Sequence, residues 1–233
     1  IVCNSEHRFL VRSEAKNVGV VPYAVILEPV ARNTAPAVTT AALLARRIDP
    51  HATIVVMASD HLMGDPAAFA AAVLQAGDLA RSGKLVLFGI APDQPHTGYG
   101  YIEVGETVRG GSPARYVRRF TEKPDLQTAQ AFLSQGNYLW NSGMFVLPVA
   151  AFLEEVQRLV PEILSSAERA LAGAKEDLGF LRLDSEAFAL APAVSIDHAI
   201  MEKTDKAVVL PFNGSWSDVG SWSSVWAHAA KDS

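Results

Sequence analysis

Two apolar runs that flank one well-capped helical segment constrain the fold of this chain more than any other feature. The runs TIVVMAS (53–59) and KLVLFGI (84–90) predict buried strands. Between them, Asp65 suits a helix N-cap, Pro66 suits the first turn and Gly83 suits the position just past the end. Because a strand, a helix and a second buried strand form a βαβ unit, we predict a parallel sheet.

The same alternation extends along the rest of the chain. A predicted strand at 24–29 precedes a helical segment at 33–48, where Asn33 or Thr34 suits the cap. Further strands are predicted at 115–122 and 142–147, and helices at 148–159 and 161–172, each opened by a proline. The chain shows no linker, charge block or internal repeat. We therefore predict one α/β domain over residues 1–233, with a mostly parallel mixed sheet flanked by helices.

Polar residues follow several of the predicted strands directly. Glu28-Pro29 follows the strand at 24–27, Asp60-His61 follows 53–59, and Glu122-Lys123-Pro124 follows 115–121. In an open parallel sheet, ligands bind beyond the carboxyl ends of the strands. These residues therefore predict one polar rim that carries the functional site.

The charge and apolar content of the chain exclude several classes of function. A net charge of −5 argues against a nucleic-acid-binding face, because phosphate neutralisation needs clustered Lys and Arg. No apolar run approaches the roughly 18 residues of a membrane span. The single cysteine, Cys3, cannot form an internal disulfide, and the N-terminus shows no signal-peptide pattern. We expect a soluble cytoplasmic protein with neither nucleic-acid nor membrane partners.

Several common catalytic motifs are missing from the sequence. A dinucleotide-binding fingerprint would need a third glycine where Glu103 stands. A phosphate-binding P-loop fails because Lys84 is followed by Leu85 rather than Ser or Thr. The 6 histidines show no zinc-ligand spacing.

Carboxylates, one lysine and an amide remain as candidates for chemistry. Asp60 and Asp218 form the pair expected to share a magnesium ion, which takes only one or two protein carboxylates. Lys123 and Glu122 together suit a sugar phosphate, and Asn141 suits sugar hydroxyls. Taken singly, each residue also has a plainer interpretation. The aspartates and Asn141 suit turns or caps, and Lys123 suits a solvated surface position.

Taken together, the segments resemble the sugar nucleotidyltransferases, and within them the mannose-1-phosphate guanylyltransferases. The resemblance is carried, in order, by CNSEHRFLV, LEPVARNTAPAV, ASDHLMGD, TGYGYIE, FTEKP, WNSGMFV, SIDHAIMEKT and WSDVGSWSSVW. The pattern is most similar to the bacterial type with a phosphomannose isomerase cupin downstream. It implies a Rossmann-like nucleotide-diphospho-sugar transferase fold.

The resemblance also implies roles for individual residues. The nucleotide-binding set is Glu28, Pro29, Arg32, Asn33, Thr34 and Asp60, and the sugar-phosphate-binding set is Tyr99, Gly100, Glu122, Lys123 and Asn141. Asp60 and Asp218 would hold Mg²⁺, and these two residues with Lys123 would be the catalytic residues. The implied reaction joins GTP and mannose 1-phosphate into GDP-mannose and pyrophosphate. A sugar phosphate oxygen is already anionic, so this reaction needs alignment and charge neutralisation rather than a general base. The resemblance also allows a homodimer.

The chain departs from the family pattern at its start. The family opens with a first strand and a Gly-rich, Arg- and Lys-bearing loop for the triphosphate, and neither stands before Ile1. No isomerase cupin follows Ser233. We therefore expect a fragment of a longer protein, one that is inactive by itself if the loop is missing. Two alternatives stay open. One is a related transferase with another nucleotide or sugar, and the other is a non-catalytic sugar-nucleotide-binding module.

Overall fold

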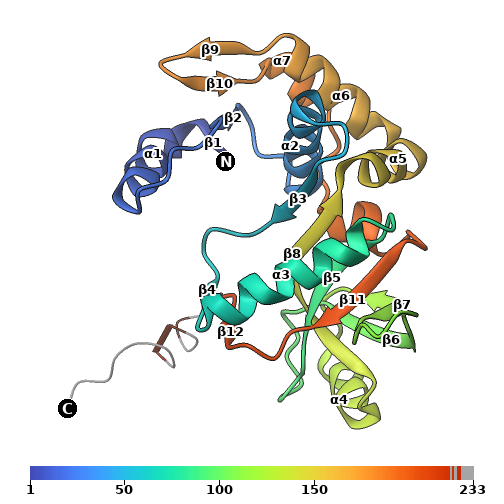
Figure 1. The fold of residues 1–233 in the computed structure, drawn as a ribbon. Helices are drawn as coiled ribbons and strands as arrows, with labels where there is room; N and C mark the ends of the chain where they lie inside the picture. The colour runs from blue at the N-terminus through green and yellow to red at the C-terminus, as the bar shows by residue number, and fades with distance from the viewer. Residues whose placement is uncertain (221, 223–224, 227–233) are drawn as a thin grey trace, which may run out of the picture. The chain divides into compact units, whose positions relative to one another are not determined.

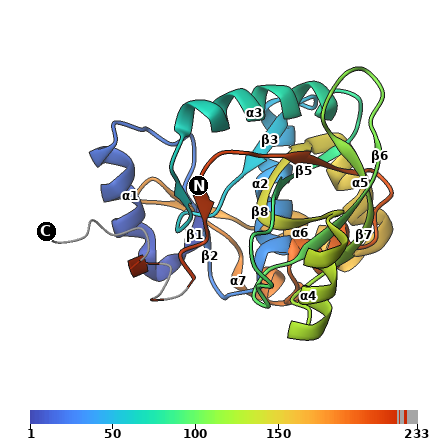
Figure 2. The same ribbon diagram turned by 90° about the horizontal axis from the view of Figure 1, so that it is seen from below.

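The computed structural model describes residues 1–220, 222, 225 and 226, and it confirms the α/β class (Figures 1 and 2). The chain forms two compact units. Unit 1 contains Ile1–Ala52 and Val149–Thr204, and unit 2 contains Thr53–Pro148 and the segment that begins at Asp205. Among the helices of these described residues, none is long and apolar enough to cross a membrane.

Unit 1 combines a small sheet with a group of packed helices. Its elements are β1 (Val2–Asn4), η1 (Ser5–His7), α1 (Arg8–Asn17), β2 (Ile26–Glu28), α2 (Thr34–Ile48), α5 (Val149–Leu159), α6 (Pro161–Ala172), β9 (Lys175–Asp177), β10 (Phe180–Arg182), α7 (Ser185–Ala189) and η2 (Asp197–Met201). The strand order is β1-β2-β10-β9, in which β2 is parallel to both of its neighbours. Helix α2 packs on α5 and α6, and α6 also packs on α7.

Unit 2 is built on a larger mixed sheet. Its elements are β3 (Thr53–Val56), β4 (Leu62–Met63), α3 (Pro66–Ala80), β5 (Leu85–Ile90), β6 (Tyr101–Thr107), β7 (Arg115–Thr121), α4 (Leu126–Gln135), β8 (Tyr138–Pro148), β11 (Ala207–Pro211) and β12 (Trp216–Ser217). The main sheet has the order β3-β8-β5-β11-β7-β6, and β4 pairs with β12 separately. Helix α3 runs across this sheet (Figures 1 and 2) and buries Phe69 and Leu79 with Phe88 and Val208 in one apolar core.

The strand pairing differs from the parallel arrangement that the sequence predicted. Strand β8 lies between β3 and β5 and is antiparallel to both, so these two strands run the same way without being neighbours. Among the described pairings, β1–β2, β2–β10 and β5–β11 are parallel and the others are antiparallel. An apolar run indicates that a strand is buried, but it does not indicate which other strand pairs with it.

The predicted starts of α2 and α3 are confirmed because both depend on local chemistry, whereas the helix predicted to open at Pro148 begins one residue later, at Val149. Asp65 accepts a hydrogen bond from the Ala68 N–H and Pro66 opens α3. The Asn33 side chain accepts from the Thr34 N–H at the start of α2. Such caps satisfy N–H groups that have no partner within the helix. These contacts fix where the helices begin, and therefore where the preceding loops present their side chains.

Candidate functional site

Residues 142–144 form a bulge inside β8, next to the candidate site. The sequence predicted that this strand begins at Ser142, whereas it spans Tyr138–Pro148. The pairing register of β5 with β8 shifts at Phe88, whose carbonyl accepts a hydrogen bond from the Ser142 hydroxyl at 2.8 Å. Gly143 has φ +71°, a conformation that strains other residues. Bulges redirect neighbouring side chains, and this one lies directly beside Asn141.

Gly100, Glu122, Lys123 and Asn141, all predicted to bind the sugar phosphate, lie together in unit 2. The Asn141 N–H donates to the Gly100 carbonyl at 2.7 Å. A Cβ atom on Gly100 would lie 2.6 Å from Glu122 Oε2, which is too close for any other residue type without a shift. Glycine is therefore needed at position 100 for the Glu122 carboxylate to lie against the backbone.

The chain bends sharply at Lys123, so that two consecutive side chains meet. Strand β7 ends at Thr121, as the sequence predicted, and Lys123 has φ +45°. The Lys123 N–H donates to the Tyr99 carbonyl at 3.2 Å, and Nζ lies 3.1 Å from Glu122 Oε1. The lysine side chain is 64% exposed, whereas that of Glu122 is 18% exposed. A half-buried carboxylate and an accessible ammonium group are thereby placed at one point.

The pairing of β4 with β12 brings the chain segment just after Asp60 alongside the segment just before Asp218. Trp216 pairs with Met63 and Ser217 with Leu62 in antiparallel register. Asp218 directly follows the paired residue Ser217, and Asp60 lies two residues before the paired residue Leu62. Directly opposite Cα atoms in such a pair lie roughly 4.5–5.5 Å apart. That the two carboxylates share one ion stays a prediction, and this pairing supports it.

Among the described residues, no group of three or more His, Cys, Asp or Glu side chains is arranged to hold a metal ion. Zinc sites take three or four such side chains as ligands. Magnesium is different because it keeps several water ligands and needs only one or two carboxylates. Asp60 is exposed and Asp218 is half-buried. This oxygen-only pair fits magnesium rather than a softer metal.

Tyr99 contacts Asp218 through its side chain and Lys123, one of the predicted sugar-phosphate residues, through its backbone carbonyl. Its hydroxyl donates to Asp218 Oδ1 at 2.8 Å. Burial raises the pKa of Tyr99 far above its usual range, and the hydrogen bond to Asp218 adds to the rise, so the phenol stays protonated. The rings of His96, Trp140 and Trp216 surround Tyr99. The sequence singled out neither His96 nor Trp140, because no local pattern indicates that these rings meet Tyr99, and it favoured core packing for Trp216, which also packs against the apolar core of unit 2.

Glu28 is the most unusual of the predicted nucleotide-binding residues in unit 1. It ends β2, where the Ser5 hydroxyl donates to its backbone carbonyl at 3.2 Å. Burial raises the pKa of its carboxyl group. Its Oε1 atom is buried and has no hydrogen-bond partner among the residues that the structure describes. A buried acceptor without a partner is costly, and a ligand with N–H donors would satisfy it.

The other predicted nucleotide-binding residues mostly make contacts within unit 1. Arg32 donates to the Ala189 carbonyl, although its buried Nε lacks a partner among the described residues. The Thr34 hydroxyl accepts from the Ile196 N–H at 2.9 Å. Asn33, with φ +63°, caps α2, and Pro29 follows Glu28 in the same loop. The Ser195-Ile196-Asp197 segment, to which the sequence assigned no role, thus holds the start of α2.

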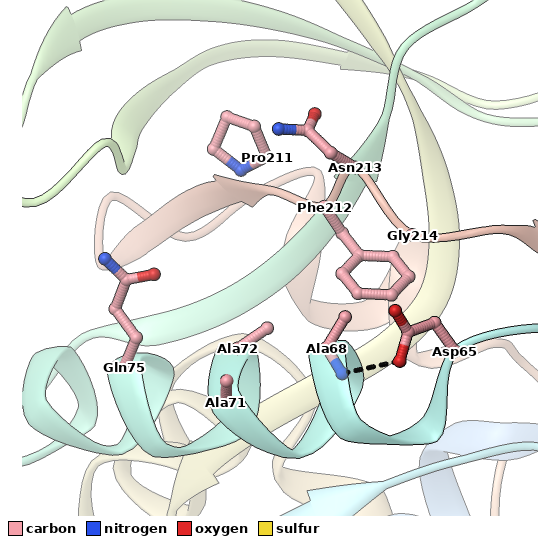
Figure 3. Close-up of a pocket in the computed structure, with 9 residues that line it drawn as sticks. All are labelled: Asp65, Ala68, Ala71, Ala72, Gln75, Pro211, Phe212, Asn213 and Gly214. Carbon is pink, nitrogen blue, oxygen red and sulfur yellow. Dashed lines mark hydrogen bonds between the residues drawn. The ribbon is translucent and has the colours of Figure 1, made fainter.

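A separate pocket of about 390 Å³ lies in unit 2 between α3 and the segment 211–214 (Figure 3). Its lining residues are Asp65, Ala68, Ala71, Ala72, Gln75, Pro211, Phe212, Asn213 and Gly214. The Asp65 carboxylate is used to cap α3 through Ala68. These lining residues include no Lys, Arg or His to hold a phosphate and none of the predicted site residues. The pocket is therefore not the candidate site.

Comparisons with known proteins agree with the resemblance seen in the sequence. The nucleotidyl transferase family pattern matches residues 1–233. The chain is 47% identical over 238 residues to mannose-1-phosphate guanylyltransferase of Escherichia coli K12, covering 99% of this chain and 50% of that protein. It is 50% identical over 225 residues to the xanthan biosynthesis protein XanB of Xanthomonas campestris, covering 97% of this chain and 47% of that protein.

A solved structure, described as mannose-6-phosphate isomerase of Helicobacter pylori, has a similar fold. The TM-score is 0.83 at 36% identity, with 93% of this chain and 83% of that chain covered. The chain spans about half the length of the curated relatives it matches. What the remaining half of those proteins does is therefore not represented by these residues.

Proposed function

Because the chain belongs to the nucleotidyl transferase family, we propose that the protein carrying it transfers GMP from GTP to mannose 1-phosphate. The products are GDP-mannose, a precursor for polysaccharide synthesis, and pyrophosphate. The observation that carries this proposal is the convergence of Gly100, Glu122, Lys123 and Asn141 at one point of unit 2. Relatives named for this activity match nearly the whole chain.

The unit 2 cluster is assigned to mannose 1-phosphate. The Glu122 carboxylate accepts hydrogen bonds from sugar hydroxyls, and the Asn141 amide can both donate and accept. The accessible Lys123 ammonium pairs with the phosphate. Lys123 Nζ lies 3.1 Å from Glu122 Oε1. A ligand that carries hydroxyls beside a phosphate can therefore contact the carboxylate and the ammonium group at the same time. Tyr99 and Gly100 complete this set, and their backbone carbonyls accept hydrogen bonds from the Lys123 and Asn141 N–H groups.

The loop after β2 in unit 1 is assigned to the nucleotide. Guanine presents two adjacent donors, N1–H and N2–H₂, and one carboxylate can accept from both. Adenine, uracil and thymine lack this pair of donors. The buried, unpaired Oε1 of Glu28, noted above for the described residues, therefore favours guanine. Pro29, Arg32, Asn33 and Thr34 form the rest of this loop and fix its shape.

Asp60 and Asp218 are assigned to a magnesium ion, which when bound neutralises phosphate charge in the transition state. The residues of the chain provide the remaining steps. Lys123 holds the sugar phosphate so that one of its oxygens attacks the α-phosphorus of GTP, and pyrophosphate leaves on the opposite side. That oxygen is already anionic, so no side chain has to remove a proton. The contribution of the protein is alignment and charge neutralisation.

A cytoplasmic location and a homodimer belong to the same proposal. The single cysteine, Cys3, suits a reducing compartment but does not require it. Fractionation of cells and the solution mass of the purified protein would test these two points.

Pyrophosphate release by the full-length protein tests the proposed reaction. GTP, ATP, UTP and dTTP are each supplied with Mg²⁺ and either mannose 1-phosphate or glucose 1-phosphate. We expect turnover mainly with GTP and mannose 1-phosphate. A preference for UTP or dTTP would contradict the guanylyl assignment. Binding of GDP-mannose without turnover of any pair would support a non-catalytic module instead.

A further inference from the structure

Tyr99 occupies a fixed position between three aromatic rings of unit 2. Its ring is stacked on His96 with centroids 3.9 Å apart and an interplanar angle of 15°. The ring centroid of Trp140 lies 5.1 Å from that of Tyr99, with the two rings steeply inclined to each other, and the ring centroid of Trp216 lies 5.6 Å from it. A phenol ring packed on several sides cannot rotate freely. The position of its hydroxyl oxygen is therefore set by the packing.

That hydroxyl donates a hydrogen bond to one oxygen of the Asp218 carboxylate and orients it. Oδ1 accepts from Tyr99 at 2.8 Å and from the Gly220 N–H at 3.1 Å. In the described part of the chain, no donor is assigned to Oδ2. Carboxylates that bind metal ions are commonly held by hydrogen bonds of this kind, which orient them and tune their affinity.

The backbone of the same residue supports the sugar-binding cluster. The Tyr99 carbonyl accepts from the Lys123 N–H at 3.2 Å, and the carbonyl of the next residue, Gly100, accepts from the Asn141 N–H at 2.7 Å. The segment 99–100 therefore contacts both the phosphate-binding lysine and the predicted cation-binding aspartate. A single rigid element that touches two ligand sites can couple their binding.

We propose that Tyr99 is a positioning residue for the cation. Its hydroxyl holds Oδ1 of Asp218 and leaves Oδ2 for a divalent ion, while its backbone holds Lys123. Tyr99 thus serves the cation site with its side chain and the sugar site with its carbonyl. This inference rests on the proposed function, in which Asp218 binds magnesium.

The test is Tyr99→Phe in the full-length protein, with Mn²⁺ as a spectroscopic substitute for Mg²⁺. Bound Mn²⁺ is measured by electron paramagnetic resonance, in the absence and presence of mannose 1-phosphate. The phenylalanine ring preserves the aromatic packing and removes only the hydroxyl. We expect Mn²⁺ affinity to fall about 10- to 100-fold, the usual effect of losing a group that orients a metal ligand. We also expect mannose 1-phosphate to strengthen Mn²⁺ binding less in the variant than in the wild type.

Tyr101→Phe is the matched control. The Tyr101 hydroxyl is buried two positions further along and has no hydrogen-bond partner among the described residues. Its removal should leave Mn²⁺ affinity unchanged. Asp218→Asn should abolish the binding that Tyr99→Phe weakens.

The outcomes separate this inference from the proposed function. If the wild type binds Mn²⁺ and Asp218→Asn does not, the cation site is correct. Wild-type affinity in Tyr99→Phe would then overturn the positioning role, even if that variant unfolds at a lower temperature. If the wild-type protein binds no Mn²⁺ with or without mannose 1-phosphate, the cation site itself is wrong, and this inference is overturned with it.

Discussion

Gly100→Ala should weaken mannose 1-phosphate binding while it leaves the fold largely intact. The added Cβ would lie 2.6 Å from Glu122 Oε2 and 3.0 Å from two ring carbons of Phe120. Ordinary contact begins at 3.4 Å, so the carboxylate must move by 3.4 − 2.6 = 0.8 Å or more and the ring by 3.4 − 3.0 = 0.4 Å. The carboxylate stands at the end of a flexible side chain. It is therefore the group that moves.

The expected loss of mannose 1-phosphate affinity follows from the hydrogen bonds that a displaced Glu122 carboxylate can no longer make. A hydrogen bond to a charged group contributes about 1.5–3 kcal/mol. Mannose 1-phosphate affinity should therefore fall about 10- to 150-fold, since about 1.4 kcal/mol is one factor of ten. Overpacking a tight site typically costs about 1–3 kcal/mol of stability. The loss of chain entropy in the unfolded state, about 0.4–1 kcal/mol for Gly→Ala, offsets part of this cost.

A double-mutant cycle on the full-length protein tests whether Gly100 acts through Glu122. Calorimetry gives the dissociation constant of mannose 1-phosphate for Gly100→Ala, for Glu122→Ala and for the double variant. If the glycine serves only to make room for the carboxylate, the double variant should bind no more weakly than Glu122→Ala alone. Gly77→Ala is the control, because a Cβ at Gly77 meets nothing within 4 Å. Additive losses from the two site substitutions would refute this explanation.

Two further substitutions probe the sugar phosphate and the base separately. Lys123→Ala should weaken mannose 1-phosphate binding about 10- to 150-fold by loss of one charged hydrogen bond; unchanged titration curves would show a solvated surface lysine instead, and Lys123→Arg should restore binding only in part. Glu28→Gln should weaken GTP binding and reduce its preference over ATP, and an unchanged preference would contradict the assignment to guanine. Burial raises the pKa of the Glu28 carboxyl group in the folded state. The folded protein therefore binds the carboxyl proton more tightly than the unfolded protein does, and the free energy of unfolding falls as pH rises. Thermal unfolding should accordingly show Glu28→Gln more stable than wild type above about pH 4.3, the ordinary carboxyl pKa, with the difference disappearing below it.

Local sequence chemistry predicted the helices well and the sheet only in part. Asp65 and Asn33 cap their helices through contacts within three residues, so the information lies in a short stretch. The strand at 53–59 was predicted to be buried, but β3 spans Thr53–Val56, lies at the end of its sheet's described strand order, and shows alternating exposure. The apolar residues of β3 do not indicate that β8, which comes far later in the chain, pairs with β3 on one side.

The site residues divide in the same way. Positions after predicted strands, such as Asp60 and Glu122, could be selected as candidates because a strand end is a local signal; Glu122 directly follows β7, whereas β3 already ends at Val56, four residues before Asp60. The contact of Tyr99 with Asp218 joins residues 119 positions apart. No spacing rule predicts it, since it depends on the tertiary structure that places β12, and with it Asp218, beside Tyr99.

Lys123 shows how a local rule can fail at a functional position. Successive residues of an extended strand point to opposite faces, so Glu122 and Lys123 should not address one ligand. The structure resolves the conflict with a left-handed backbone at Lys123, φ +45°, immediately after β7 ends. For a residue other than glycine this conformation is uncommon, and strained backbone of this kind costs about 1–3 kcal/mol. The Lys123 N–H contact with Tyr99 and the ion pair with Glu122 hold the strained residue in place. A glycine at this position would relieve the strain but would carry no ammonium group, so the strained lysine is consistent with the phosphate-binding role proposed for it.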